Sequence, residues 1–125
     1  MVKIITYGTF DTFHYGHIEL LRRAKEMGDY LIVGLSTDEF NELKGKTSKF
    51  AYWKRKQWLE GIKYVDEIIP EENWQQKYND VKKYNLNIFV MGDDWRGKFD
   101  DVDCVVKYLD RTPGVSSTDI KKIKK

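Results

Sequence analysis

The chain has few of the residues and segments that stabilise small secreted domains or anchor proteins in membranes. Cys104 is the single cysteine among 125 residues, which excludes a disulfide framework and a zinc site built on cysteines. No apolar run approaches the roughly 18 residues of a membrane-spanning helix, and the N-terminus lacks the apolar segment of a secretory signal. We therefore expect a cytoplasmic protein that does not enter a membrane.

The chain also has little excess charge. Its 22 basic and 20 acidic residues leave a formal net charge of +2, which argues against a broad nucleic-acid surface but allows a local basic cluster to bind a small anion. Hydrophobic residues make up 41% of the chain, a proportion typical of a folded protein. There is no internal repeat and no linker rich in proline or glycine, so we expect a single domain over residues 1–125.

Apolar runs and helical spacings alternate along the chain. Short apolar runs that end at Gly, Asp, Ser or Pro predict five strands, at residues 2–7, 30–35, 67–69, 87–91 and 104–109. Apolar residues at helical spacing predict three intervening helices, marked by Ile18 to Met27, by Trp58, Leu59, Ile62 and Val65, and by Trp74, Tyr78, Val81 and Tyr84. This alternation predicts an α/β fold with a parallel sheet covered by helices on both faces.

The first candidate site follows the first predicted strand. His14 and His17, the only histidines, flank Gly16 where a helix is expected to start, so both imidazoles and the backbone N–H groups of that turn can face an anion such as phosphate. Ordinary surface histidines are an equal alternative for such a pair taken alone. Zinc ligation is weaker, because the spacing differs from the usual i, i+4 and no third ligand of that kind is present.

The second candidate site is RTPGVSST at residues 111–118, after the last predicted strand. Arg111 can donate hydrogen bonds to two phosphate oxygens at once. Gly114 allows a tight turn, and the hydroxyls of residues 116–118 lie at a predicted helix start. Ser116 and Asp119 also fit a capping box, so a well-capped helix is the alternative. Ligands of open α/β sheets bind beyond the carboxyl ends of the strands, and both motifs follow such ends.

A basic run, KGKTSKFAYWKRK at residues 44–56, is predicted to be a mobile loop that leads into a helix. Lys44 and Lys46 can supply charge to a polyphosphate as the loop closes, whereas Lys49 and Lys54 are expected to be solvated and Arg55 is left open. Three further residues have two interpretations each. Asp94 and Asp38 either contact a nucleotide or metal or cap helices, and Trp74 either stacks on a ligand or packs in a core or interface.

Several motifs carry a family resemblance. GTFD at 8–11, HYGH at 14–17 and RTPGVSST at 111–118 resemble the signatures of the cytidylyltransferases, within the HxGH nucleotidyltransferase superfamily. The similarity extends to STDEF, YVDEIIPE, VMGDDW and GKFD and so covers essentially the whole chain. Length and motif spacing are most similar to the members that use sn-glycerol 3-phosphate.

The resemblance implies transfer of a cytidylyl group from CTP to sn-glycerol 3-phosphate by direct in-line attack on the α-phosphate, giving CDP-glycerol and pyrophosphate. It implies Mg²⁺ with CTP, for which we predict no dedicated protein site, and a homodimer. The charge and hydropathy of the chain predict no nucleic-acid or membrane partner. It also implies a Rossmann-like, doubly wound, five-stranded parallel sheet and a role in supplying precursors of teichoic acid or capsule. A cytidylyltransferase for ethanolamine phosphate or another polyol phosphate, and a non-catalytic nucleotide-binding module, are the alternatives.

The resemblance also implies roles for individual residues by matching position. The catalytic residues would be His14, His17, Lys46 and Arg111, and Lys44 and Lys77 would bind glycerol phosphate. The nucleotide would contact Thr9, Phe10, His14, Tyr15, Gly16, His17, Lys46, Lys63, Asp94, Arg111, Thr112, Pro113, Gly114, Val115, Ser116, Ser117 and Thr118. Two positions depart from the family pattern: Lys63 replaces an arginine and cannot reproduce its bidentate contact, and Ser117 replaces a threonine but keeps the hydroxyl.

Overall fold

The computed structural model describes residues 1–110, except for the side chain of Asp94. Within these residues, five strands form one parallel sheet in the order β3-β2-β1-β4-β5. The strands are β1 (Lys3–Gly8), β2 (Tyr30–Ser36), β3 (Glu67–Glu71), β4 (Ile88–Gly92) and β5 (Val105–Leu109). Each predicted apolar run therefore forms a strand, with ends within two residues of the predicted ones. Pro70, which cannot donate a ladder hydrogen bond, lies in the edge strand β3.

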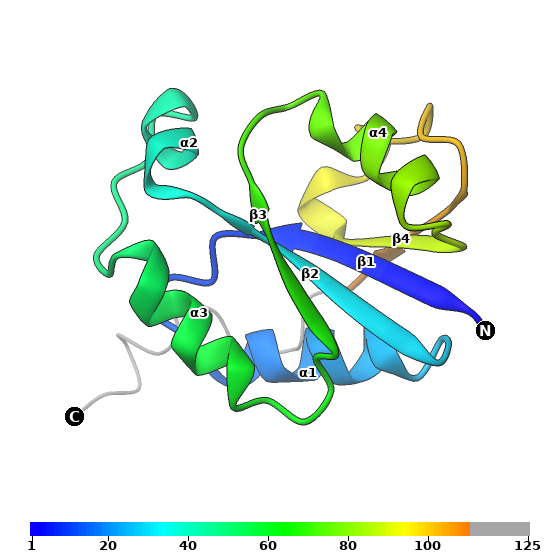
Figure 1. Ribbon diagram of the computed structural model, residues 1–125, viewed down its shortest axis with the longest axis horizontal. Helices are drawn as coiled ribbons and strands as arrows, with labels where there is room; N and C mark the ends of the chain where they lie inside the picture. Colours follow the sequence, from blue (N-terminus) through cyan, green and yellow to red (C-terminus); the bar gives the residue numbers. More distant parts are fainter. Residues whose placement is uncertain (111–125) are drawn as a thin grey trace.

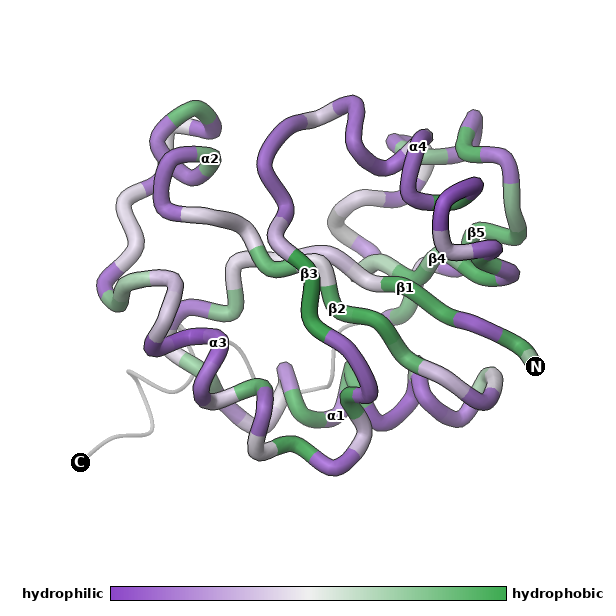
Figure 2. Tube along the Cα trace, viewed as in Figure 1, coloured by the Kyte–Doolittle hydropathy of each residue, from purple (hydrophilic) through white to green (hydrophobic). Residues whose placement is uncertain are grey.

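Helices cover both faces of this sheet, as expected for a doubly wound Rossmann-like fold (Figure 1). The helices are α1 (Tyr15–Lys25), α2 (Asp38–Leu43), α3 (Tyr52–Glu60), α4 (Gln76–Lys83) and the short 3₁₀ helix η1 (Asp93–Trp95). On one face, Leu21 of α1 and Leu59 of α3 join a mainly aliphatic cluster. On the other, Val81 of α4 joins a cluster rich in aromatic residues. Figure 2 shows the apolar strands enclosed by more polar outer segments.

Two α-helices differ from the prediction, and the 3₁₀ helix η1 was not predicted. The helix predicted from Trp58, Leu59, Ile62 and Val65 begins earlier and ends at Glu60, with Gly61 as its C-cap. Ile62 and Val65 lie in the following turn yet pack on the same core, which explains the apparent helical spacing. The short helix α2 was not predicted, because six residues give too little periodicity, although its Thr37 N-cap and acidic first turn are typical helix-start signals.

The strand order reverses beside β1, which lies between β2 and β4. Chain segments leave the carboxyl ends of β1 and β4 toward opposite faces, and a crevice forms between them, which is where such folds bind ligands. Gly34 of β2 is the register partner of Tyr7, and a Cβ atom at position 34 would lie 2.3 Å from the Tyr7 ring. The absence of a side chain at Gly34 therefore lets the Tyr7 ring lie flat beside the crevice. Among the described residues, no helix is long and apolar enough to cross a membrane.

Candidate active site

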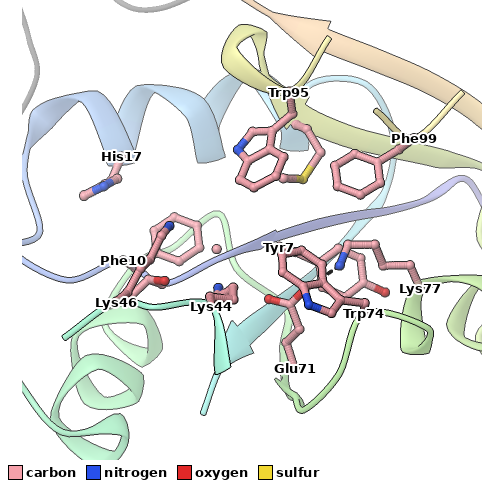
Figure 3. A pocket seen from close by; sticks show the side chains of 13 residues that line it. Tyr7, Phe10, His17, Lys44, Lys46, Glu71, Trp74, Lys77, Trp95 and Phe99 are labelled. Atoms are coloured by element: carbon pink, nitrogen blue, oxygen red, sulfur yellow. Dashed lines mark hydrogen bonds and ion pairs between the residues drawn. The ribbon is translucent and has the colours of Figure 1, made fainter. Parts of the chain in front are cut away.

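A cavity of about 240 Å³ opens at the carboxyl ends of the strands (Figure 3). Figure 3 places His17 and Lys46 toward one end of it and Lys77, Trp74 and Phe99 toward the other, with Lys44 between them. The cavity is lined by Tyr7, Gly8, Thr9, Phe10, His17, Lys44, Lys46, Glu71, Trp74, Lys77, Met91, Trp95 and Phe99. The sequence-predicted histidine motif and basic segment thus meet in one place. We call its two regions the histidine end and the lysine end.

At the histidine end, both imidazoles are held by the backbone at the start of α1. Nδ1 of His14, the N-cap residue, accepts a hydrogen bond from the N–H of Gly16 (3.0 Å), and Nδ1 of His17 accepts one from the N–H of His14 (3.1 Å). A backbone N–H can only donate, so neither Nδ1 carries a proton. In the neutral ring the proton is therefore on Nε2, which leaves each histidine with one N–H donor for a ligand.

The environment of these rings favours their neutral form. The His17 ring stacks on His14 with centroids 4.0 Å apart and packs against Phe10 and Phe13 at 5.3 and 5.2 Å. Burial, and secondarily the neighbouring His14, lowers the pKa of His17 to about 4, and burial lowers the pKa of His14 from its ordinary value. Near neutral pH both side chains are uncharged hydrogen-bond donors.

One expectation about this turn is wrong. The backbone N–H groups at the start of α1 were expected to be free for an anion, but those of Gly16 and His17 are already bonded, to His14 Nδ1 (3.0 Å) and to the His14 carbonyl (3.0 Å). The histidines therefore cap the helix themselves. An anion at this end would be met by the imidazole Nε2–H groups instead of these two backbone groups.

At the lysine end, Lys77 forms a buried ion pair. Its side chain is 2% exposed and that of Glu71 is 4% exposed, and Nζ lies 2.7 Å from Glu71 Oε2. The ammonium group also lies 4.9 Å from the ring centroid of Tyr7 and 5.3 Å from those of Trp74 and Phe99. Tyr7 is in turn fixed by donating a 2.6 Å hydrogen bond from its hydroxyl to Asp80 of α4.

Lys44 is linked to the same carboxylate through Ser36. The Lys44 Nζ donates to Ser36 Oγ (2.7 Å), and this hydroxyl donates to Glu71 Oε1 (2.8 Å). Burial lowers the pKa of Lys44 to about 8, although the nearby Glu71 acts in the opposite direction. Lys46, by contrast, is exposed at the rim. The two lysines that the resemblance assigns to glycerol phosphate are thus linked to one carboxylate, Lys77 directly and Lys44 through Ser36.

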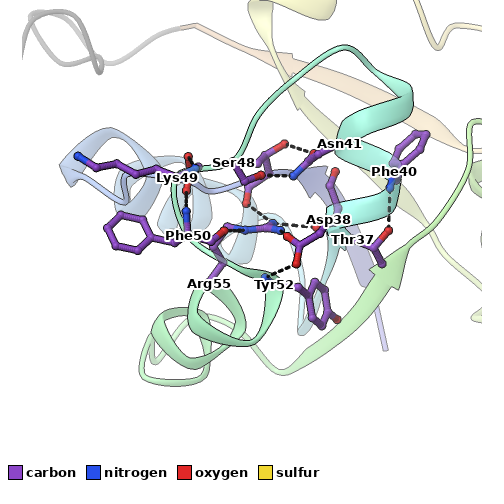
Figure 4. Close-up of polar contacts among 12 residues, drawn as sticks. Thr37, Asp38, Phe40, Asn41, Ser48, Lys49, Phe50, Tyr52 and Arg55 are labelled. Carbon is purple, nitrogen blue, oxygen red and sulfur yellow. Dashed lines mark hydrogen bonds and ion pairs between the residues drawn. The ribbon is translucent and has the colours of Figure 1, made fainter.

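Arg55 joins the segments that surround the cavity (Figure 4). It is fully buried and donates to the carbonyls of Phe50 (2.9 Å), Thr9 (2.9 Å) and Ser36 (2.7 Å). Its fourth contact is an ion pair with Asp38 (2.7 Å). Arg55, left open from the sequence, is therefore a brace between the loops after β1 and β2 and the basic segment. Asp38 also accepts a hydrogen bond from the N–H of Tyr52 (3.1 Å), at the start of α3. The N-cap of α2 is Thr37 and not Asp38.

Hydrogen bonds hold the basic segment to the loop after β1 and to α2. Asp11 accepts hydrogen bonds from the backbone N–H groups of Lys49 (2.6 Å) and Phe50 (3.0 Å), and the N–H of Lys46 donates to the Asn41 carbonyl (2.9 Å). As predicted, the segment then enters a helix, α3. Its closure over a ligand stays a prediction.

The other predicted site residues lie in several places. Thr9 and Phe10 line the cavity, while His14, Tyr15 and Gly16 form the adjoining start of α1. Lys63 is exposed after α3, with Nζ 5.3 Å from the Tyr64 ring centroid, and does not line the cavity. Asp94 lies in η1 with its side chain outside the description, and Arg111, Thr112, Pro113, Gly114, Val115, Ser116, Ser117 and Thr118 lie outside the described residues.

Apart from Gly8, which was given only as part of the GTFD motif, sequence reasoning missed five lining residues: Tyr7, Glu71, Met91, Trp95 and Phe99. Four of them could have been found. Tyr7 and Met91 lie near the ends of β1 and β4, Glu71 is the last residue of β3, and Trp95 ends η1, which follows β4. The strand-end rule applied to every strand would have included them. Phe99 had no such signal.

The described residues do not offer a metal-binding cluster. Among them, no group of three or more His, Cys, Asp and Glu side chains is arranged to hold a metal ion. Glu71, the carboxylate that lines the cavity, is bonded to Lys77 and Ser36.

Comparison with known proteins gives consistent matches over nearly the whole chain. A model of the cytidylyltransferase-like family matches residues 5–123. Glycerol-3-phosphate cytidylyltransferase of Staphylococcus aureus is 60% identical, over 98% of this chain and 94% of that protein. The enzyme of the same name from Bacillus subtilis is 58% identical, over 98% of this chain and 96% of that protein.

Two more distant proteins are similar to this chain, one over part of its own sequence and the other in its fold. Mouse ethanolamine-phosphate cytidylyltransferase is 34% identical over 96% of this chain, a region that makes up 32% of the mouse protein. Among solved structures, the lipopolysaccharide core biosynthesis protein from Thermoplasma volcanium superimposes with a TM-score of 0.73 at 25% identity. That match covers 90% of this chain and 97% of the other.

Proposed function

Because the chain belongs to the cytidylyltransferase-like family, we propose that it transfers the cytidylyl group of CTP to sn-glycerol 3-phosphate, forming CDP-glycerol and pyrophosphate. The observation that carries this is the meeting of His17 with three lysines in one cavity, with the His14 ring stacked on His17 beside it. Nucleotidyl transfer needs positioned donors and neutralising charge more than a covalent partner, and the cavity supplies both.

In the proposed reaction, a phosphate oxygen of sn-glycerol 3-phosphate attacks the α-phosphorus of CTP. The new P–O bond forms as the bond from that phosphorus to the bridging oxygen of the β-phosphate breaks, and pyrophosphate leaves with the bonding electrons. The Nε2–H groups of His14 and His17 donate to the α-phosphate oxygens, which gain charge at this moment. Because both rings are neutral, they stabilise that charge without holding either substrate by a permanent ion pair.

The lysines have a complementary role, since both substrates arrive negatively charged. Lys46, at the rim, is proposed to bind the triphosphate. The resemblance assigns the same role to Arg111 and to the other predicted contacts of residues 112–118. Lys44 and Lys77 face the acceptor. Mg²⁺ bound to the triphosphate would neutralise further charge there. Lys63 is proposed as a weaker nucleotide contact than the arginine usual in the family.

The decisive experiment is product identification. The purified protein is incubated with CTP, Mg²⁺ and, separately, sn-glycerol 3-phosphate, ribitol 5-phosphate or ethanolamine phosphate, and products are identified by mass spectrometry. We expect CDP-glycerol and an equal amount of pyrophosphate from the first acceptor. A different preferred acceptor, or no product from any, would refute the proposal. Replacement of CTP by ATP tests the choice of base, and chelation of Mg²⁺ tests the metal.

The proposal extends to the setting of the reaction. We propose a homodimer of single-domain chains in the cytoplasm, where CTP is available, with CDP-glycerol serving as a precursor of teichoic acid or capsule. Sedimentation equilibrium of the purified protein measures the subunit number, and a monomer at assay concentrations would contradict the dimer.

A further inference from the structure

The lysine end of the cavity contains an aromatic cage, formed by Tyr7, Trp74 and Phe99, around a cation that belongs to the protein. Aromatic groups in this arrangement ordinarily bind the ammonium group of a ligand, by attraction between the cation and the ring faces. Here Lys77 Nζ lies 4.9 to 5.3 Å from all three ring centroids. The position that a ligand's ammonium group would take is already filled.

The burial and the helix position of Lys77 are both unfavourable for a positive charge. Lysine is rarely fully buried, and Lys77 also lies in the first turn of α4, where the helix dipole disfavours a positive charge. Its ion pair with Glu71 offsets part of this cost. Each Glu71 oxygen already accepts a hydrogen bond, Oε1 from Ser36 and Oε2 from Lys77, so a ligand's ammonium group would have to compete with Lys77 for this carboxylate.

Resting on the proposed function, we infer that Lys77 is a specificity-determining residue: by filling the cage and pairing with Glu71 it excludes phosphate acceptors that carry an ammonium group and selects phosphates of uncharged polyols. An incoming ammonium group would find the cage occupied and a like charge beside it. A polyol hydroxyl instead can accept a hydrogen bond from Lys77 Nζ, which has three donors, of which one bonds Glu71.

The inference predicts a switch of preference when Lys77 is removed. Lys77→Met keeps an unbranched side chain that is one atom shorter and leaves Glu71 without its partner beside the cage, a combination suited to an ammonium group. The test measures kcat/KM for sn-glycerol 3-phosphate, ethanolamine phosphate and phosphocholine in wild type and variants. We expect the ratio of ethanolamine phosphate to glycerol phosphate to rise by about a hundredfold, equivalent to about 2.7 kcal/mol.

Two further variants separate the causes. In Lys77→Met/Glu71→Gln the cage is open but the carboxylate is neutral, so we expect the ratio to rise by about tenfold, from cation–aromatic attraction alone. Lys82→Met is the matched control, since Lys82 is an exposed lysine of the same helix outside the cavity. It should leave the ratio as in wild type.

An unchanged ratio in both Lys77 variants would overturn the inference. If Lys77→Met does not fold, the double variant decides, because it leaves no unpaired buried charge. Failure of the proposed function is seen separately, as absence of CDP-glycerol from the wild-type protein. In that case calorimetric titration with ethylammonium chloride still tests the cage, which should bind this ion in Lys77→Met and not in wild type.

Discussion

The functional side chains at the two ends of the cavity are held in position by different interactions. At the histidine end, uncharged rings are oriented by backbone N–H groups at a helix start. At the lysine end, charged groups are oriented by one buried carboxylate and three aromatic rings. The difference matches what each end would meet in the proposed reaction. Charge develops transiently on the α-phosphate, which neutral donors can stabilise, whereas the acceptor arrives with its charge already formed.

The largest expected effect comes from removing the Nε2–H donor of His17. Asparagine keeps an acceptor near the position of Nδ1 for the His14 N–H but has no group at Nε2. We expect His17→Asn to lower kcat by about 10² to 10³, the usual cost of losing one such donor. Steady-state kinetics with saturating substrates measure this. His17→Ala serves as the comparison, since it should lose turnover and also the cap, lowering stability by about 1 kcal/mol.

Stability should depend strongly on the lysine end. Lys77→Met leaves Glu71 buried without its partner, so we expect the free energy of unfolding to fall by about 3 kcal/mol in urea titrations. Lys77→Met/Glu71→Met should recover most of this loss, because no buried charge remains. Lys46→Met, at the exposed rim, is the control and should change stability by less than about 0.5 kcal/mol. Equal effects at positions 46 and 77 would contradict the buried pair.

The charge of Lys44 should set an upper pH limit for binding of the acceptor at the lysine end. Because burial lowers the pKa of Lys44 to about 8, its positive charge is present below that pH and is lost as the pH rises through it. We expect KM for sn-glycerol 3-phosphate to rise by about tenfold between pH 7 and pH 9. Lys44→Arg stays charged over this range and should show no such rise, whatever its KM at pH 7. A rise that persists in Lys44→Arg would assign the limit to another group.

The smallest expected effect is a displaced titration at the histidine end. The chain has two histidines, so NMR spectra contain two sets of imidazole signals to follow with pH. We expect both midpoints below 6.5, with that of His17 near pH 4. The unfolded chain then binds protons first, so stability is lost as the pH falls from 6.5 toward 4. Phe13→Ala exposes His17 and should move its midpoint upward; an unmoved midpoint would remove burial as the cause.

Local signals in the sequence were enough to predict the five strands and the place of both histidines at the start of a helix. The strand runs and the His14 to His17 spacing depend on residues close together in the chain, so their pattern is visible without the fold. The lysine end joins Tyr7, Glu71 and Phe99, which are distant in sequence. Nothing local marks a lysine as buried, and the usual exposure of lysine and arginine argued against the observed burial of Lys77 and Arg55.

Gly34 has a consequence for the wall of the cavity. A Cβ atom at this position would approach the Tyr7 ring to 2.3 Å, so any side chain there would force the ring to shift. A position with no side chain, in the interior of β2, therefore provides the space for a ring that lines the cavity, although Gly34 itself does not line it. A substitution at Gly34 should thus alter the lysine end without changing any residue that lines it.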